Sequence, residues 1–358
     1  MKYELNTTLL FSSIRYASLQ FIILIMALLL PINLATAHPG PLAYIAGSSD
    51  TMEVIDTANN TVTTTIPLRT STFGQPASVA VNLTGTRAYV SYRSTLGAVS
   101  MIDTSTKAEI ANSQQWPNLG GIVISPNGMH VYAVLGQGSV AVFNADTLGL
   151  ITQISVWGPN PPYGKDSHAI AINSSGTRLY VTSRAIVNGI IRGGFVSVID
   201  TATNALITKI PVGESPLSIV LNSAGTMAYV TTHDHNVTVI DTTTNIVTAT
   251  IAGMSYPFAI AINTDGTRLY VANEGNSTVS VIDTSNNSVV TTVPIGPIGG
   301  VLRSIATNPS GSRVYTASGG SPGTGRVTVI DATTNTVTTS IPVSGTLSYI
   351  GMGPSFCN

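Results

Sequence analysis

Histidines are the residues of this 358-residue chain that suit metal chemistry best. His233 and His235 are separated by one residue, so on an extended strand end their side chains point to the same side. His168 is expected to begin the inner strand of a neighbouring repeat. Three converging imidazoles would suit zinc or copper, which both accept nitrogen ligands. The alternative is that residues 233–235 form an ordinary polar surface hairpin.

A second chemical hypothesis pairs His168 with Arg303. In a lyase or hydrolase, the imidazole would act as base and the guanidinium would stabilise a developing oxyanion, although three repeats separate the two residues. The chain has no G-x-S-x-G elbow, no phosphate loop of the G-x-x-x-x-G-K type, no H-E-x-x-H and no C-x-x-C. Its sole cysteine, Cys357, cannot form an internal disulfide.

Aromatic and basic residues mark a third kind of site, a binding surface. These candidates for protein contact or carbohydrate stacking are Trp116, Trp157, Tyr163, Arg184 and Arg326. Residues 157–167 and 184–194 are expected to form long loops, the first rich in proline and the second carrying exposed apolar side chains. The alternative is that these loops plug the mouth of a channel.

An internal repeat must position all of these residues. A tyrosine-containing run recurs seven times, at Tyr44, Tyr89, Tyr132, Tyr180, Tyr229, Tyr270 and Tyr315. The successive spacings are 45, 43, 48, 49, 41 and 45 residues, which is the period of a four-stranded propeller blade. The pattern therefore predicts an all-β, seven-bladed β-propeller of four-stranded antiparallel blades.

Each repeat divides into four strands by its period-two alternation and its turn residues. In the sixth copy, Gly266 is expected in a hairpin that needs positive φ, and Asp283 is expected to accept hydrogen bonds from backbone N–H groups in the next hairpin. The repeated arginines Arg87, Arg178, Arg268 and Arg313 are expected to be architectural. The inner strands are expected to start at Ala77, Gly120, His168, Leu217, Phe258, Arg303 and Leu347.

The first copy lacks its inner strand, and a surplus strand remains at the carboxyl end. Pairing of residues 346–352 with the first blade would close the ring and leave no unpaired inner edge. The expected blades are residues 43–68 with 346–352, 76–113, 119–153, 168–212, 217–252, 258–295 and 301–343. The third copy departs most from the pattern, with Phe143-Asn144 where others have Ile-Asp, which predicts an altered hairpin.

These repeats resemble the YVTN family of β-propellers. Tyr229-Val230-Thr231-Thr232 and Tyr270-Val271-Ala272-Asn273 stand at the signature position, and Val-Ile-Asp-Thr follows each of them. The resemblance covers residues 43–352 and implies a fold more than a function, because similar propellers include surface-layer proteins, binding scaffolds, lactonase-like proteins and subunits of quinoprotein amine dehydrogenases.

Charge is scarce and unevenly placed. In the expected propeller, the loops after the second strand and those between blades share one face, here called the top face. Apart from the six repeated aspartates and residues 1–37, five of the nine remaining acids fall there, namely Asp50, Asp166, Glu214, Asp234 and Glu274. The top face also receives His168, His233, His235 and most of the arginines outside the repeat. Function is therefore expected on the top face.

Composition excludes several classes of protein. Only 9% of residues are charged, against about 25% in an average domain, and the net charge of −1 offers no basic surface for nucleic acid. Recurrent Val, Ile and Tyr argue against disorder. The mean hydropathy of +0.33 suggests a membrane protein, but the one continuous apolar run, residues 21–30, is too short to span a bilayer.

The first 37 residues read as a signal peptide. Lys2 and Arg15 precede the apolar run, Pro31 ends it, and residues 35–37 (Ala-Thr-Ala) supply a cleavage pattern. An uncleaved anchor is the alternative. We therefore expect an extracytoplasmic protein, periplasmic, secreted or surface-held, in which residues 38–358 form one propeller domain.

The expected function is that of a monomeric binding scaffold. Its top-face loops would hold a protein or carbohydrate partner, without catalysis and with no certain cofactor. The alternative is an extracytoplasmic enzyme or enzyme subunit, lactonase-like, lyase-like or quinoprotein dehydrogenase-like, with a histidine-containing top-face site and zinc or copper as its candidate metal.

Overall fold

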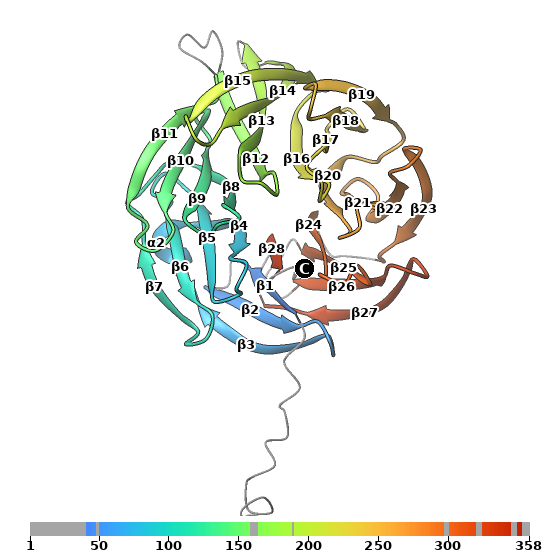
Figure 1. Cartoon of the computed structure of the whole chain (residues 1–358). Coiled ribbons are helices and arrows are strands. Elements are labelled where there is room, and N and C mark those ends of the chain that lie inside the picture. The colour runs from blue at the N-terminus through green and yellow to red at the C-terminus, as the bar shows by residue number, and fades with distance from the viewer. Residues whose placement is uncertain are drawn as a thin grey trace, which may run out of the picture. The chain divides into compact units, whose positions relative to one another are not determined.

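Seven four-stranded antiparallel sheets are arranged in a ring, as the repeat predicts (Figure 1). The computed structural model describes residues 41–47, 50–157, 164–187, 190–296, 301–319, 324–344 and 349–352. Residues 1–37 and Leu347 lie outside the described residues. In the described part of the chain, no helix is long and apolar enough to cross a bilayer.

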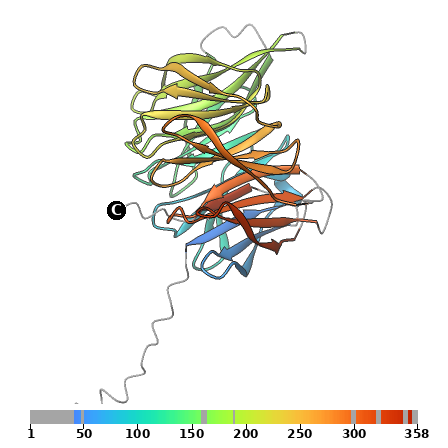
Figure 2. The same cartoon turned by 90° about the vertical axis from the view of Figure 1, so that its right-hand side faces the viewer.

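Each blade runs from an inner strand at the channel to an outer strand at the rim (Figure 1), and Figure 2 shows the same ring turned by 90°. The inner strands are β4 (Gln75–Val81), β8 (Leu119–Ile124), β12 (Gly164–Ile172), β16 (Pro216–Leu221), β20 (Pro257–Ile262), β24 (Val301–Thr307) and β28 (Tyr349–Met352). The second strands are β5 (Arg87–Arg93), β9 (His130–Leu135), β13 (Arg178–Val187), β17 (Met227–Thr232), β21 (Arg268–Asn273), β25 (Arg313–Gly319) and β1 (Leu42–Ala46).

The third and fourth strands complete the blades. The third strands are β6 (Val99–Asp103), β10 (Ser139–Asn144), β14 (Ile190–Asp200), β18 (Asn236–Asp241), β22 (Thr278–Asp283), β26 (Arg326–Asp331) and β2 (Thr51–Asp56). The fourth strands are β7 (Ala108–Asn112), β11 (Leu150–Ser155), β15 (Ala205–Val212), β19 (Ile246–Ile251), β23 (Ser288–Pro294), β27 (Thr336–Pro342) and β3 (Thr61–Pro67). A four-residue helix, α2 (Thr70–Phe73), precedes β4.

The ring closes as predicted. The carboxyl-terminal strand β28 pairs with β1, with Tyr349 opposite Ala46 and Gly351 opposite Tyr44. The first blade therefore combines the two ends of the propeller sequence, and the inner edge of β1 is paired with β28.

The hydrophobic core lies between blades. Each cluster of buried apolar side chains joins two adjacent blades; one of them packs Val54 and Ile66 of the first blade against Val79 and Val90 of the second. Because a blade buries its apolar faces only against its neighbours, we expect the ring to fold as a unit.

The turn residues act as the repeat predicts. The six hairpin glycines, Gly85, Gly128, Gly176, Gly225, Gly266 and Gly311, have φ between 67° and 74°. The carboxylate of Asp283 accepts a 2.9 Å hydrogen bond from the Ser285 N–H, and the equivalent aspartates do the same in their hairpins. Arg268 forms an ion pair with Asp283, and Arg178 forms one with Asp200. These arginines are therefore architectural.

The hairpin of the third blade is altered, as predicted. Asn144 replaces the aspartate and accepts a 2.9 Å hydrogen bond from the Asp146 N–H. The turn then runs to Leu150, one residue further than the equivalent turn between Asp241 and Ile246. The blade nevertheless keeps its four strands.

Candidate functional site

A repeated β-bulge places one or two residues of six inner strands at the top mouth of the channel. In six blades, the pairing between the inner and second strands shifts register near the start of the inner strand. The residues that the pairing skips are Ala77, Gly120 and Gly121, His168 and Ala169, Leu217, Phe258, and Arg303. A bulge of this kind turns a side chain away from the direction it would have in a regular strand. The expected inner-strand starts therefore coincide with the bulges in these six blades.

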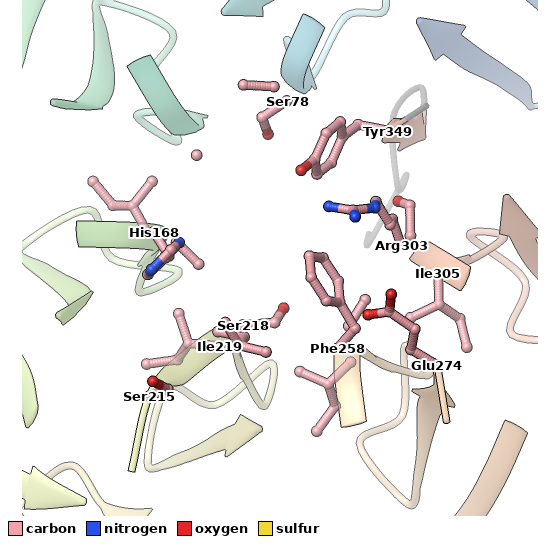
Figure 3. A pocket seen from close by; sticks show the side chains of 18 of the residues that line it. Ser78, His168, Ser215, Ser218, Ile219, Phe258, Glu274, Arg303, Ile305 and Tyr349 are labelled. Carbon is pink, nitrogen blue, oxygen red and sulfur yellow. The ribbon is translucent and has the colours of Figure 1, made fainter. Parts of the chain in front are cut away.

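Bulged residues from all six of these blades line a cavity of about 440 Å³. His168 lies on one side of this mouth cavity, and Phe258 and Arg303 lie on the opposite side (Figure 3). Tyr349 and Glu274 complete the wall around Arg303 (Figure 3). A cavity of this size can hold a small molecule or the end of a larger one.

Arg303 presents its charge to the cavity. Its guanidinium carbon lies 5.2 Å from the centre of the Phe258 ring, a cation–π contact. Among the described residues it has no ion-pair or hydrogen-bond partner. The carboxylate of Glu274 likewise has none within the described part of the chain. Both charges are therefore available to a ligand.

A second cavity of about 380 Å³ adjoins the first on the His168 side. Arg93 and Arg184 line both cavities, whereas Arg303 lines only the first. The lining of the mouth cavity thus holds three arginines against one acid, Glu274. Although the chain as a whole has a net charge of −1, basic side chains outnumber acidic ones in the lining of this cavity.

The three candidate metal histidines do not converge, so that expectation is wrong. His168 and His233 line the mouth cavity, but the ring of His235 packs edge-on against Tyr256, with 4.5 Å between ring centres. Residues 233–235 form the turn between β17 and β18, and His235 has a φ of 69°, so the same-side rule for extended strands does not apply. Within the described residues, no group of three or more histidine, cysteine or acidic side chains is placed to hold a metal ion.

The two tryptophans belong to the packing of the blades. Trp157 is 5% exposed, its ring lies edge-on to Phe195 at 4.7 Å, and the Lys209 Nζ donates a 2.6 Å hydrogen bond to its carbonyl oxygen. Trp116 is partly buried and packs edge-on against Phe143 at 6.5 Å. Neither residue lines the mouth cavity.

The remaining candidates have different positions. Arg184 lines both cavities. Arg326 begins β26 and does not line the mouth cavity. Tyr163 lies outside the described residues.

The expected loop over residues 184–194 is largely strand. β13 and β14 continue into it with 10 and 11 residues, and they pair as far as Val187 opposite Ile190. The expected loop over residues 157–167 also ends early, because β12 begins at Gly164. The pairing therefore continues where the glycines suggested a loop.

Tyr349 is the site residue that sequence reasoning missed. It pairs with Ala46, two residues after the repeated tyrosine Tyr44. The residues at the same place in other inner strands are small: Ser78, Ser218, Ala259 and Ser304. The sequence signal that could have identified Tyr349 was a large aromatic residue at a position where these other blades have a small one.

Comparison with solved structures identifies the fold. One chain of Kuenenia stuttgartiensis hydrazine synthase is similar with a TM-score of 0.63 and 18% identity, over 88% of this chain and 99% of that one. A protein of unknown function from Desulfotomaculum acetoxidans DSM 771 is similar with a TM-score of 0.69 and 15% identity, over 88% of this chain and 99% of that one. At such identities the likeness concerns the fold alone.

Comparison of the sequence with known proteins assigns the chain to no family. No protein-family model matches the chain, and no curated protein matches it. The propeller is therefore established, whereas membership of the YVTN family is not confirmed.

Proposed function

We propose that this protein is a binding module whose top face, centred on the mouth cavity, holds a protein or carbohydrate partner without catalysing a reaction. The observation that carries this proposal is the cavity of about 440 Å³ into which Arg303 presents a guanidinium with no partner among the described residues. A charged group held at a concave site gains most when a ligand of opposite charge replaces its water.

Export is part of the proposal. Its support is the sequence of residues 1–37, with basic residues before a short apolar run and Ala-Thr-Ala at the end. Expression in a secreting host, followed by sequencing of the amino terminus of the exported protein, tests it. A new terminus at His38 supports a cleaved signal, and retention of Met1 in a membrane fraction supports an anchor instead.

An enzyme remains the second candidate, because His168 and Arg303 line the same cavity. An imidazole on one side and a guanidinium on the other suit proton transfer on an anionic substrate. The likeness to a hydrazine synthase chain makes a role as an enzyme subunit worth testing, but it supports no activity by itself.

Binding assays with paired variants separate the two candidates. Wild-type protein is screened on arrays of immobilised glycans and peptides beside Ser218→Phe, which narrows the mouth cavity, and Lys107→Asn. Lys107 has a φ of 58° and lies in a hairpin between third and fourth strands, on the face opposite the top face. Asparagine occupies the equivalent position in other blades, as at Asn245. This variant therefore removes a charge far from the mouth without straining the turn.

Binding that survives Lys107→Asn and is lost in Ser218→Phe supports the top-face module. Equal binding by all three proteins places the partner elsewhere and overturns the proposal. The same proteins are incubated with a panel of lactones and nitrophenyl esters. Hydrolysis that disappears in His168→Ala would establish the enzyme instead.

A further inference from the structure

We infer that Arg303 is the anchor for a carboxylate group of the ligand, and that the ligand carries a hydroxyl or ammonium group close to that carboxylate. This inference rests on the proposed binding role of the mouth cavity and adds the chemical class of the ligand.

The repeat itself singles out Arg303. Six blades share an equivalent bulge position, so the residues that occupy it can be compared directly. At the bulge, other blades use Ala77, Gly120 or Leu217, so the fold accepts small or apolar residues there. An arginine at this position gains no ion pair among the described residues. Its charge is best explained by a group that enters the cavity.

The contact with Phe258 favours a planar anion. The guanidinium lies over the ring with 5.2 Å between its central carbon and the ring centre, and Figure 3 shows it reaching into the cavity. A guanidinium supported by an aromatic ring still has N–H groups at its edge, which match the two oxygens of a carboxylate.

A phosphate fits the site less well. Phosphate sites commonly use successive backbone N–H groups at a helix amino terminus or in a glycine-rich loop. The mouth cavity is instead lined largely by strands, and the one helix among the described elements, α2, has four residues and contributes no lining residue. The carboxylate of Glu274 on the same wall would also repel a doubly charged anion.

Glu274 and Tyr349 define the second part of the ligand. Both lie beside Arg303 in Figure 3, and the Glu274 carboxylate has no hydrogen-bond partner among the described residues. An ionised carboxylate accepts hydrogen bonds, so it suits a hydroxyl or ammonium group. A hydroxy acid, an amino acid or an acidic sugar would meet Arg303 and Glu274 at once.

Calorimetric titration with matched probes tests the inference. D-glucuronate and L-phenylalanine carry the expected groups, and D-glucose and L-phenylalaninamide are their counterparts without a carboxylate. Inorganic phosphate tests the alternative anion. The proteins are wild type, Arg303→Ala, Arg303→Lys and the charge-matched control Lys107→Asn, each first checked for an unchanged thermal midpoint.

We expect one of the two acids to bind and its neutral counterpart to bind at least about 10-fold more weakly, since a hydrogen bond to a charged group contributes roughly that factor. Arg303→Ala should lose about 10- to 100-fold in affinity, Arg303→Lys should recover only part of it, and Lys107→Asn should bind like wild type. Whether glucuronate or phenylalanine binds identifies a sugar or an amino acid as the source of the carboxylate.

Three results would overturn the carboxylate assignment: neither acid binds, acid and neutral counterpart bind equally, or phosphate binds more tightly than both acids. If top-face binding on the arrays nevertheless persists and depends on the mouth cavity, the binding module stands and only the ligand class is wrong.

Discussion

The hydroxyl of Tyr89 in the second blade donates a 2.8 Å hydrogen bond to the carbonyl oxygen of Ala145 in the third blade. Tyr315 makes the same kind of contact across the closure of the ring, where its hydroxyl lies 3.2 Å from the carbonyl oxygen of Thr57. In these two copies, the tyrosine that marks the repeat in sequence therefore fixes one blade to a turn of the next. Burial accounts for the raised pKa of both phenols.

Replacing Tyr89 by phenylalanine should destabilise the protein by about 1–2 kcal/mol, because the ring remains but the buried carbonyl of Ala145 loses its donor. Urea denaturation followed by circular dichroism measures the change. Tyr229→Phe is the matched control, since the Tyr229 hydroxyl has no hydrogen-bond partner within the described residues. Equal losses in the two variants would show that the interblade hydrogen bond contributes nothing.

Much of the fold could be predicted because the same pattern of strands and turns occurs several times in the sequence. Gly266 follows a turn-forming Asn-Thr-Asp sequence, and five other copies carry glycine at the same place, so one local rule fixed six hairpins. The missing first strand and the surplus last strand then required the pairing of β28 with β1. The local turn residues and the closure of the ring predict the same architecture, so the fold could be inferred from the sequence.

The site could be predicted only in part. The bulge positions of Phe258 and Arg303 were found as strand starts, but their contact and the empty volume before them depend on how seven strands converge. The positive φ of His235 arises in a short turn, and the position of its ring is set by packing against Tyr256, which belongs to a separate loop. Contacts between distant loops leave no pattern in a single sequence. The sequence therefore could not show that His168, His233 and His235 form no group that could hold a metal ion.

The closing strand is expected to tolerate no added bulk at Gly351. A Cβ atom there would lie 2.7 Å from the Cγ1 of Val79 and 3.0 Å from its carbonyl oxygen. Gly351→Ala should therefore destabilise the protein by about 1–3 kcal/mol through overpacking between the first and second blades. Guanidinium denaturation of Gly351→Ala, Val79→Ala and the double variant measures the coupling. The double variant should lose less than the sum of the singles, and strict additivity would argue against the contact.

Acid should weaken the hairpins that the repeated aspartates hold. The Ser285 hydroxyl, followed by Arg268, lowers the pKa of Asp283 from 3.8 to about 2. Because the folded protein binds this proton more weakly than the unfolded chain, the contribution of Asp283 is complete above about pH 4 and is lost as the pH falls towards 2. Scanning calorimetry from pH 5 to about pH 2 should show a falling thermal midpoint.

Asp283→Asn isolates this effect, since Asn144 already fills the equivalent place in the third blade. The variant should show a shallower fall of the thermal midpoint below pH 4, and Lys107→Asn should keep the slope of the wild type. The hypothesis fails if Asp283→Asn and wild type lose stability in parallel, because the proton would then be bound elsewhere.

Trp157 should prove to be a stability residue. Its ring is 5% exposed, lies edge-on to Phe195 at 4.7 Å and has the Lys209 Nζ 5.4 Å from its centre. Trp157→Ala should cost about 3–5 kcal/mol of folding free energy, as is usual for a large buried aromatic side chain. Leu96→Ala is the control on the same face, because Leu96 is 53% exposed and should change stability by less than about 0.5 kcal/mol. Thermal unfolding gives both changes in stability.

Array binding by the folded Trp157→Phe variant shows whether the partner contacts this ring. Binding equal to that of wild type is expected, because Trp157 does not line the mouth cavity; a loss of binding at unchanged stability would return Trp157 to the binding surface.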